Sequence, residues 1–293
     1  MPDENARFDH LDSAGRLAAL TAARPRAIVN LVVIAAVATS WAAIAAMSIG
    51  AAQLGLPAEA APGDSLLRWL PDVPIPAWAL GFLALCLTPG TISAGLGAGF
   101  LFMWLMWTLM SVAMMLPSAA PMIRTYCEIA DTAQAKGEAA VHPLVLIAGY
   151  LTVWVAASAA LAGVSVLVQS RTGVPVTGYT AVAALGIAGL YQFSGYKEAC
   201  LKKCRNPFAV LFARWSSRPL RILRLGAEQG VWCLGCCWAL MLVMFAVGTM
   251  NIFWMALIGL FTVVEKQTSG RYATRLAGAI LLVWATALLL VSR

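Results

Sequence analysis

The sequence predicts an all-α, polytopic transmembrane helical bundle of about seven spans. Apolar residues make up 61% of the 293-residue chain, charged residues make up 11%, and the mean hydropathy is +0.81. Soluble domains, by comparison, are roughly 45–50% apolar and 25% charged. The apolar runs are long and do not alternate with polar residues. Because hydrocarbon offers no hydrogen bonds to an open backbone, the spans must be helices rather than barrel strands.

Seven apolar segments follow one another, each close to the roughly 20 residues that a helix needs to cross a bilayer. We divide the chain into a cytoplasmic tail at 1–26, an anchor helix with an extracytoplasmic loop at 27–98, and a helical bundle at 99–293. The fifth and sixth segments are short and must share a tight turn around Gly248 and Asn251. The expected spans are 27–49, 99–122, 142–168, 179–196, 231–247, 249–265 and 273–291.

The distribution of basic residues orients the chain. Seven crossings place the tail and every second connection on one side, and all lysines and arginines except Arg68, Arg171 and Arg293 fall there. The positive-inside rule then puts the N-terminus in the cytoplasm, which for a bacterial protein predicts the inner membrane. The basic connection at 197–230 is typical of an anchor against anionic lipid, so we expect membrane lipids and no nucleic acid as partners.

Five of the seven cysteines fall into two groups with helical spacing. Cys233, Cys236 and Cys237 are spaced i, i+3, i+4, so on a helix they share one face. Cys200 and Cys204, spaced i, i+4, share a face in the continuation of the fourth segment. The expected topology brings both groups to the cytoplasmic surface of the membrane, where they can meet.

Three interpretations of these thiols stay open. Cysteine is a small hydrophobe that cores accept readily, so the residues can simply pack. The CxxC spacing is also that of a membrane thiol–disulfide oxidoreductase, although a relay for secreted proteins needs its thiols at the outer face. Thiolates backed by thioethers are a soft ligand set that selects Cu(I), and zinc fits a four-thiolate site. We favour the metal site and keep the oxidoreductase as the alternative.

Methionines line one face of the second segment. Met103, Met106, Met110 and Met114 follow i, i+3, i+7, i+11. Such a stripe usually fills a core, but beside a thiol cluster it is also a ladder of soft donors that can hand Cu(I) along. In the fifth segment, the face of the thiols continues through Met241 and Met244.

Other polar residues near the segment ends complete the candidate site. We expect Glu265 and Lys266 to form a pair solvated at the interface, with a carboxylate that balances a cationic site as the alternative. Gln192 is a candidate for a hydrogen bond to the metal ligands. His142 and His10 belong to no ligand pattern, and the sequence carries no phosphate loop, zincin helix or Ser-His-Asp arrangement. Binding and transfer, not enzymatic turnover, are therefore expected.

Three strings of sequence resemble one known family. They are MWTLMSVAMMLPSAAP at 106–121, YQFSGYKEACLKKCRNP at 191–207 and GVWCLGCCWALM at 230–241, followed by GTMN, WM and EK. The chain resembles bacterial integral membrane proteins that are predicted to bind metal and are described in places as copper chaperones linked to polyphenol oxidases. The resemblance runs from about residue 100 to 270 and implies delivery of copper to a tyrosinase-like or laccase-like oxidase. It marks Cys200, Cys204, Cys233, Cys236, Cys237, Met110, Met114, Met115, Gln192, Lys197, Met241, Met250, Glu265 and Lys266.

Overall fold

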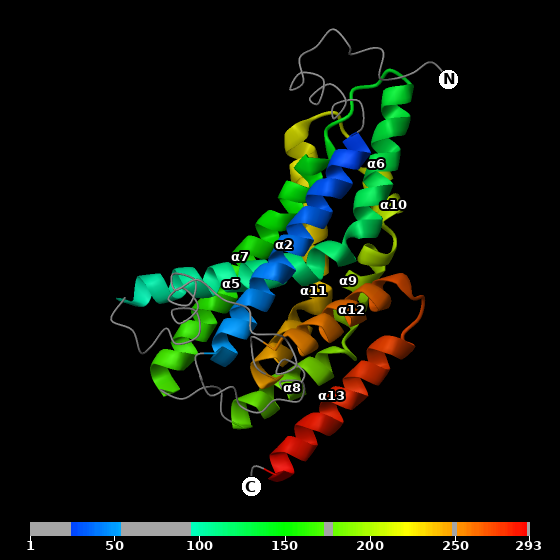
Figure 1. Ribbon diagram of the computed structural model, residues 1–293. Helices are drawn as coiled ribbons and strands as arrows, with labels where there is room; N and C mark the ends of the chain where they lie inside the picture. The colour runs from blue at the N-terminus through cyan, green and yellow to red at the C-terminus, as the bar shows by residue number, and fades with distance from the viewer. Residues whose placement is uncertain (1–24, 54–94, 173–177, 248–250, 292–293) are drawn as a thin grey trace.

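The computed structural model describes residues 25–53, 95–172, 178–247 and 251–291 (Figure 1). These ranges contain ten helices and no strand, which confirms the all-α class for the part of the chain described. The tail at 1–24, most of the expected outer loop and Met250 lie outside the described residues. The helices are α2 (Pro25–Gln53), α5 (Gly95–Ser118), α6 (Ala120–Ala135), α7 (Pro143–Thr172), α8 (Gly178–Tyr191), α9 (Gly195–Arg205), α10 (Pro207–Ala213), α11 (Pro219–Val247), α12 (Ile252–Gln267) and α13 (Tyr272–Val291).

Five helices contain stretches long and apolar enough to cross a membrane, and these fall on the first, second, third, fifth and seventh expected segments. The fourth and sixth segments fall on α8 and α12, which have 14 and 16 residues, fewer than the roughly 17 that a span needs. The count of seven spans and the cytoplasmic N-terminus stay predictions. The five stretches are Arg26–Ser48, Gly99–Ser118, Pro143–Leu167, Pro219–Met244 and Tyr272–Val291.

Two expected segments have different ends in the structure. The second segment stops at Ser118, and α6 begins at Ala120 with Pro121 in its first turn. A proline there has no amide to continue the preceding helix, but its fixed φ suits the start of a new one. The helix of the fifth segment begins earlier than expected, at Pro219. The apolar pattern did not show its first turns because arginines and Glu228 interrupt the pattern before 231.

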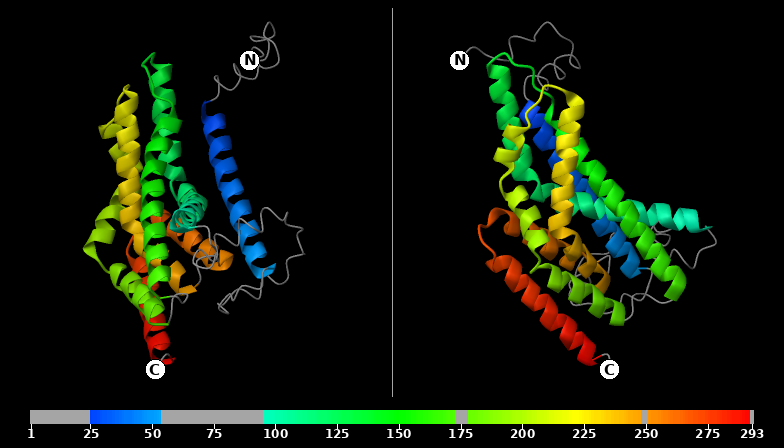
Figure 2. Two further views of the ribbon diagram at one scale, coloured as in Figure 1. Left: turned by 90° about the vertical axis from the view of Figure 1, so that its left-hand side faces the viewer. Right: turned by 180° about the vertical axis from the view of Figure 1, so that it is seen from behind.

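Helices α7 and α11 run side by side in both figures and form the most extensive helix pair of the fold (Figures 1 and 2). Glycines permit this close approach. A Cβ at Gly149 would lie 2.0 Å from the carbonyl oxygen of Leu223, and one at Gly226 would lie 2.0 Å from that of Leu146. Helix α5 crosses this pair at a steep angle, is seen nearly end-on in the left view of Figure 2, and packs against α2, α7 and α12.

The apolar side chains are distributed as in a protein surrounded by lipid. Large aliphatic residues such as Leu31, Ile34 and Leu101 are exposed on the outer faces of α2 and α5. The interior holds most of the methionines and, at the junction of α9, α11 and α12, the ionisable residues Lys197 and Glu265. Buried charges of this kind mark functional positions in membrane proteins. Helix α6 and the beginning of α11 project away from α12 and α13 (Figures 1 and 2).

Candidate metal centre

Three buried thiols from the middle of α11 form the centre of the site. The sulfur atoms of Cys233, Cys236 and Cys237 all lie within 4.8 Å of one another, and this group can hold a metal ion. A thiolate binds a zinc-like ion at about 2.3 Å, so two sulfurs that share one ion lie at most about 4.6 Å apart. The cluster therefore needs almost no movement to close around an ion. In this structure the Cys236 and Cys237 thiols donate to the Cys233 carbonyl at 3.0 and 2.9 Å.

The other two cysteines stand on a helix of their own rather than on a continuation of the fourth segment. Helix α8 ends at Tyr191, and Ser194 caps α9 by accepting a hydrogen bond from the Lys197 amide at 3.1 Å. The turn between the two helices sets α9 against α11, and α9 carries Cys200 and Cys204 to the thiol cluster.

Cys204 lies beside the cluster but outside the group of three thiols, whereas Cys200 packs against the backbone of α11. A hydrogen bond with Cys236, together with burial, raises the pKa of the Cys204 thiol well above its ordinary value. The Cys200 sulfur fills the space beside Gly235, where a Cβ would lie 2.6 Å from it. The structure thus brings the two groups of thiols together, with Cys204 nearest to the cluster on α11.

A lysine and a tyrosine contact the cluster from the other side. The Lys266 ammonium donates to the Ser118 hydroxyl at 2.7 Å and to the Cys233 sulfur at 3.0 Å. The Tyr150 hydroxyl lies 3.0 Å from the same sulfur and donates to the Met115 carbonyl at 3.1 Å. Hydrogen bonds from a cation favour the charged form of a thiol. Lys266 is therefore placed to stabilise the Cys233 sulfur when it carries a negative charge.

The expected solvated pair of Glu265 and Lys266 is wrong, because both side chains are buried and point to different partners. Glu265 forms an ion pair with Lys197 at 2.9 Å and accepts a hydrogen bond from Thr274 at 2.8 Å. Lys197 also donates to the Cys236 carbonyl at 2.8 Å. A buried pair repays its desolvation only when its remaining hydrogen bonds are made, as they are here. The pair joins α9 and α12 to the backbone of the thiol cluster.

The methionines of the candidate site are all in the core, and one of them touches a thiol. The Met115 thioether lies 3.5 Å from the Cys237 sulfur. Met114 packs against α12 beside Gly259. The spacing of the second segment had singled out the stripe through Met110 and Met114, and Met115 came only from the family resemblance. The fully buried methionines also include Met110, Met241 and Met244.

Sequence reasoning missed three of the residues that hold the site together. Tyr150, Ser118 and Thr274 lie within or beside apolar helices, where a single hydroxyl carries no pattern that separates it from packing. Gln192, expected to bond to the ligands, is buried, but its amide has no hydrogen-bond partner among the described residues. Gln192 and Thr274 line the same cavity, and Thr274 donates to the Glu265 carboxylate.

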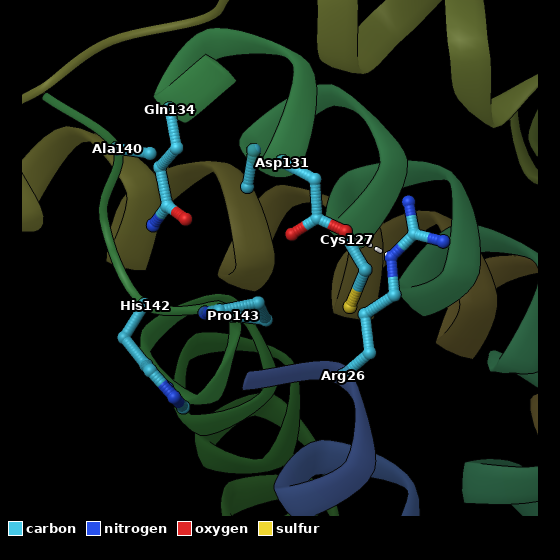
Figure 3. Close-up of a pocket in the computed structure, with 8 residues that line it drawn as sticks. Arg26, Cys127, Asp131, Gln134, Ala140, His142 and Pro143 are labelled. Atoms are coloured by element: carbon cyan, nitrogen blue, oxygen red, sulfur yellow. Dashed lines mark ion pairs between the residues drawn. The ribbon is translucent and has the colours of Figure 1, made fainter. Parts of the chain in front are cut away.

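A second cluster with metal-ligating residue types does not converge. A cavity of about 70 Å³ is lined by Arg26, Cys127, Asp131 and His142, among others (Figure 3). The Asp131 carboxylate is paired with Arg26, and the imidazole points away from both the carboxylate and the thiol. The His142 Nδ1 instead accepts from the Leu144 amide at 3.3 Å.

Comparison with known protein families identifies a related family. A family model described as PpoB2, copper chaperone, matches residues 104–288, which is more than half of the chain and includes every thiol and lysine of the centre. No curated protein and no solved structure is similar enough to this chain to count as a match.

Proposed function

This chain belongs to the PpoB2 family of copper chaperones, and we propose that it is a membrane protein that binds Cu(I) through Cys233, Cys236 and Cys237. Thiolates and thioethers are the soft donors that select Cu(I) over harder cations. The centre has three cysteine sulfurs, with the Met115 thioether 3.5 Å from Cys237 and the Cys204 thiol beside Cys236, and this set of soft donors supports such a cargo. Zn²⁺ is the second ion that this set can accept.

The observation that carries the proposal is the buried lysine beside the thiols. Lys266 is buried, and its partners are the Ser118 hydroxyl and the Cys233 sulfur rather than a carboxylate. An unbalanced charge in such a place costs several kcal/mol. Cu(I) with the three thiolates carries a net charge of −2, and the ammonium balances one of these two negative charges. A cluster of neutral thiols that only packed in the core would leave the buried ammonium of Lys266 without a counter-charge.

The remaining sulfurs have supporting roles in the proposal. Cys204, hydrogen-bonded to Cys236 and partly exposed, would receive the ion first and pass it to the buried cluster. The thioether of Met115 would hold the ion on its way out, and the buried stripe through Met110 and Met114 gives a route of soft donors through the core. Met241 and Met244 extend the same function along α11.

The destination of the copper and the setting of the protein are part of the same proposal. The five long apolar helices and their exposed aliphatic faces support a membrane protein, and the basic residues that the expected seven-span topology gathers on one side support an inner-membrane protein with a cytoplasmic N-terminus. The family description supports a copper-dependent recipient, for which a tyrosinase-like or laccase-like oxidase is the candidate. The chain itself then supplies binding and transfer rather than turnover.

Metal analysis of the purified protein tests the proposal. The full chain is isolated in detergent under reducing conditions, supplied with Cu(I), and its bound copper and zinc are measured. Changing Cys233, Cys236 and Cys237 to serine should abolish the bound copper. The matched control is Cys127→Ser, which removes a buried thiol of α6 far from the cluster and should leave the metal content unchanged. Equal copper in the triple variant and in the wild type would end the proposal.

A further inference from the structure

A second cavity lies outside the thiol cluster, where the end of α8 meets α9 and the beginning of α13. It has a volume of about 40 Å³ and is lined by Gln192, Arg205, Arg271, Thr274 and Arg275, among others. Two of these residues connect the cavity to Glu265. Thr274 donates to the Glu265 carboxylate at 2.8 Å, and the Arg205 guanidinium donates to the Glu265 carbonyl at 2.8 and 3.1 Å. Neither the copper proposal nor the family match assigns it a ligand.

Gln192 indicates that the cavity holds something polar. The side chain is only 3% exposed, and neither its amide nitrogen nor its oxygen has a hydrogen-bond partner among the described residues. A buried carboxamide without partners is costly, so native structures provide it with a water or a ligand. At roughly 10–15 Å³ for each water centre, the cavity accommodates about three waters or one tetrahedral oxyanion.

The charges around the cavity select an anion. Three guanidinium groups line it against one carboxylate, that of Glu198. This carboxylate is already shared between Arg271 and Lys202, and the Arg271 contact lowers the pKa of Glu198. Arg275 forms no ion pair with any of the described residues. A cation such as Cu(I) is repelled here, whereas a phosphate group can accept hydrogen bonds from both the guanidinium groups and the Gln192 amide.

The surroundings of the cavity fit a phospholipid. On the neighbouring faces of α8 and α13, Leu190 is 65% exposed and Leu276 is 64% exposed, as required of side chains that contact acyl chains. The rim carries the exposed aromatic ring of Tyr272, which begins the last apolar stretch. Aromatic and basic side chains gather at the depth of the headgroups, so a cavity at this level meets phosphate.

We infer that this cavity binds a phosphate group, supplied by the headgroup of an anionic phospholipid. The inference rests on the proposed membrane setting but not on copper binding. The lipid would hold α8, α9 and α13 together around the far side of the Lys197–Glu265 pair. In this position it would support the orientation of α9, and hence of Cys204, without being a ligand of the metal.

Native mass spectrometry of the full chain in detergent tests the inference. The protein is titrated with phosphatidylglycerol or with phosphatidylcholine, and the affinity for the first bound lipid is measured. We expect one phosphatidylglycerol to bind more tightly than phosphatidylcholine, and Arg275→Gln to weaken it about tenfold, the loss typical of one charged hydrogen bond. The matched control is Arg221→Gln, an identical change of charge at an exposed position of α11 outside the cavity.

A second variant and a competition experiment complete the test. Gln192→Leu removes the amide without adding bulk and should also weaken the first lipid, whereas a cavity that holds only water would lose no lipid. Equal retention by wild type and both cavity variants, or an equal loss in Arg221→Gln, would overturn the inference. Inorganic phosphate at millimolar concentration identifies the source. If it displaces the first lipid from the wild type, the site also takes the free anion. If it leaves the variant-sensitive lipid bound, the headgroup is the ligand.

Discussion

Removing the positive charge of Lys266 should weaken Cu(I) binding strongly while leaving the fold intact. In Lys266→Met the ammonium that lies 3.0 Å from the Cys233 sulfur is lost, and a side chain of similar length fills its space. Two unit charges about 4 Å apart at an effective dielectric constant of about 20 attract each other by about 4 kcal/mol. This corresponds to about a thousandfold in affinity. Because the metal-free variant no longer buries a cation, its unfolding temperature should not fall.

Competition with a Cu(I) chelator under reducing, oxygen-free conditions measures this affinity. Allowing for rearrangement of water and neighbouring dipoles, we expect Lys266→Met to bind Cu(I) at least about a hundredfold more weakly than the wild type. Lys266→Arg keeps the charge and should stay within about tenfold of the wild type. Unchanged affinity in Lys266→Met, with copper still bound by the thiols, would refute the reasoning that the lysine balances the charge of the metal–thiolate group.

Three further predictions concern the contacts around the thiols. Gly235→Ala places a methyl group 2.6 Å from the Cys200 sulfur and should lower stability by about 1–3 kcal/mol in denaturant unfolding, and Cys200→Ala in the same chain should restore most of the loss. Lys197→Met leaves Glu265 buried without its partner and should cost about 3–5 kcal/mol, most of which a second change, Glu265→Gln, should return. The thiol–disulfide alternative predicts that the Cys236→Ser variant is trapped as a mixed disulfide with an oxidised client, because the Cys233 thiolate attacks the client disulfide, releases one client thiolate and then lacks Cys236 to resolve the bond, whereas a copper chaperone forms no such adduct.

The arrangement of the thiols could be predicted because it follows from spacing. On a helix, the positions i, i+3 and i+4 share a face whatever the helix packs against, so the cluster of Cys233, Cys236 and Cys237 needed only a correct helix. The membrane orientation that the basic residues indicate stays a prediction. The meeting of Cys204 with this cluster needed the additional fact that α8 ends at Tyr191 and α9 turns back, a change of direction that Ser194 caps but does not enforce.

The partners of the charged residues could not be predicted, because they depend on helices distant in the chain. Glu265 and Lys266 are adjacent in sequence, which made an ion pair at the interface the simplest expectation. On α12 they point about 100° apart, so one meets Lys197 and the other meets the thiols. The apolar pattern also failed to show the first turns of α11, whose stability comes from packing on α7 through Gly226 rather than from an amphipathic repeat.

The length of α11 decides from which direction copper can arrive. Between Pro219 and Cys233 the helix rises about 21 Å at 1.5 Å per residue, too far for a carrier protein that rests on the tip of α11 to touch the sulfurs. The partly exposed Cys204 of α9 instead offers access to the sulfurs from the side, about halfway along α11. We therefore expect a donor to approach the flank of the molecule beside α9 and to exchange ligands there one sulfur at a time.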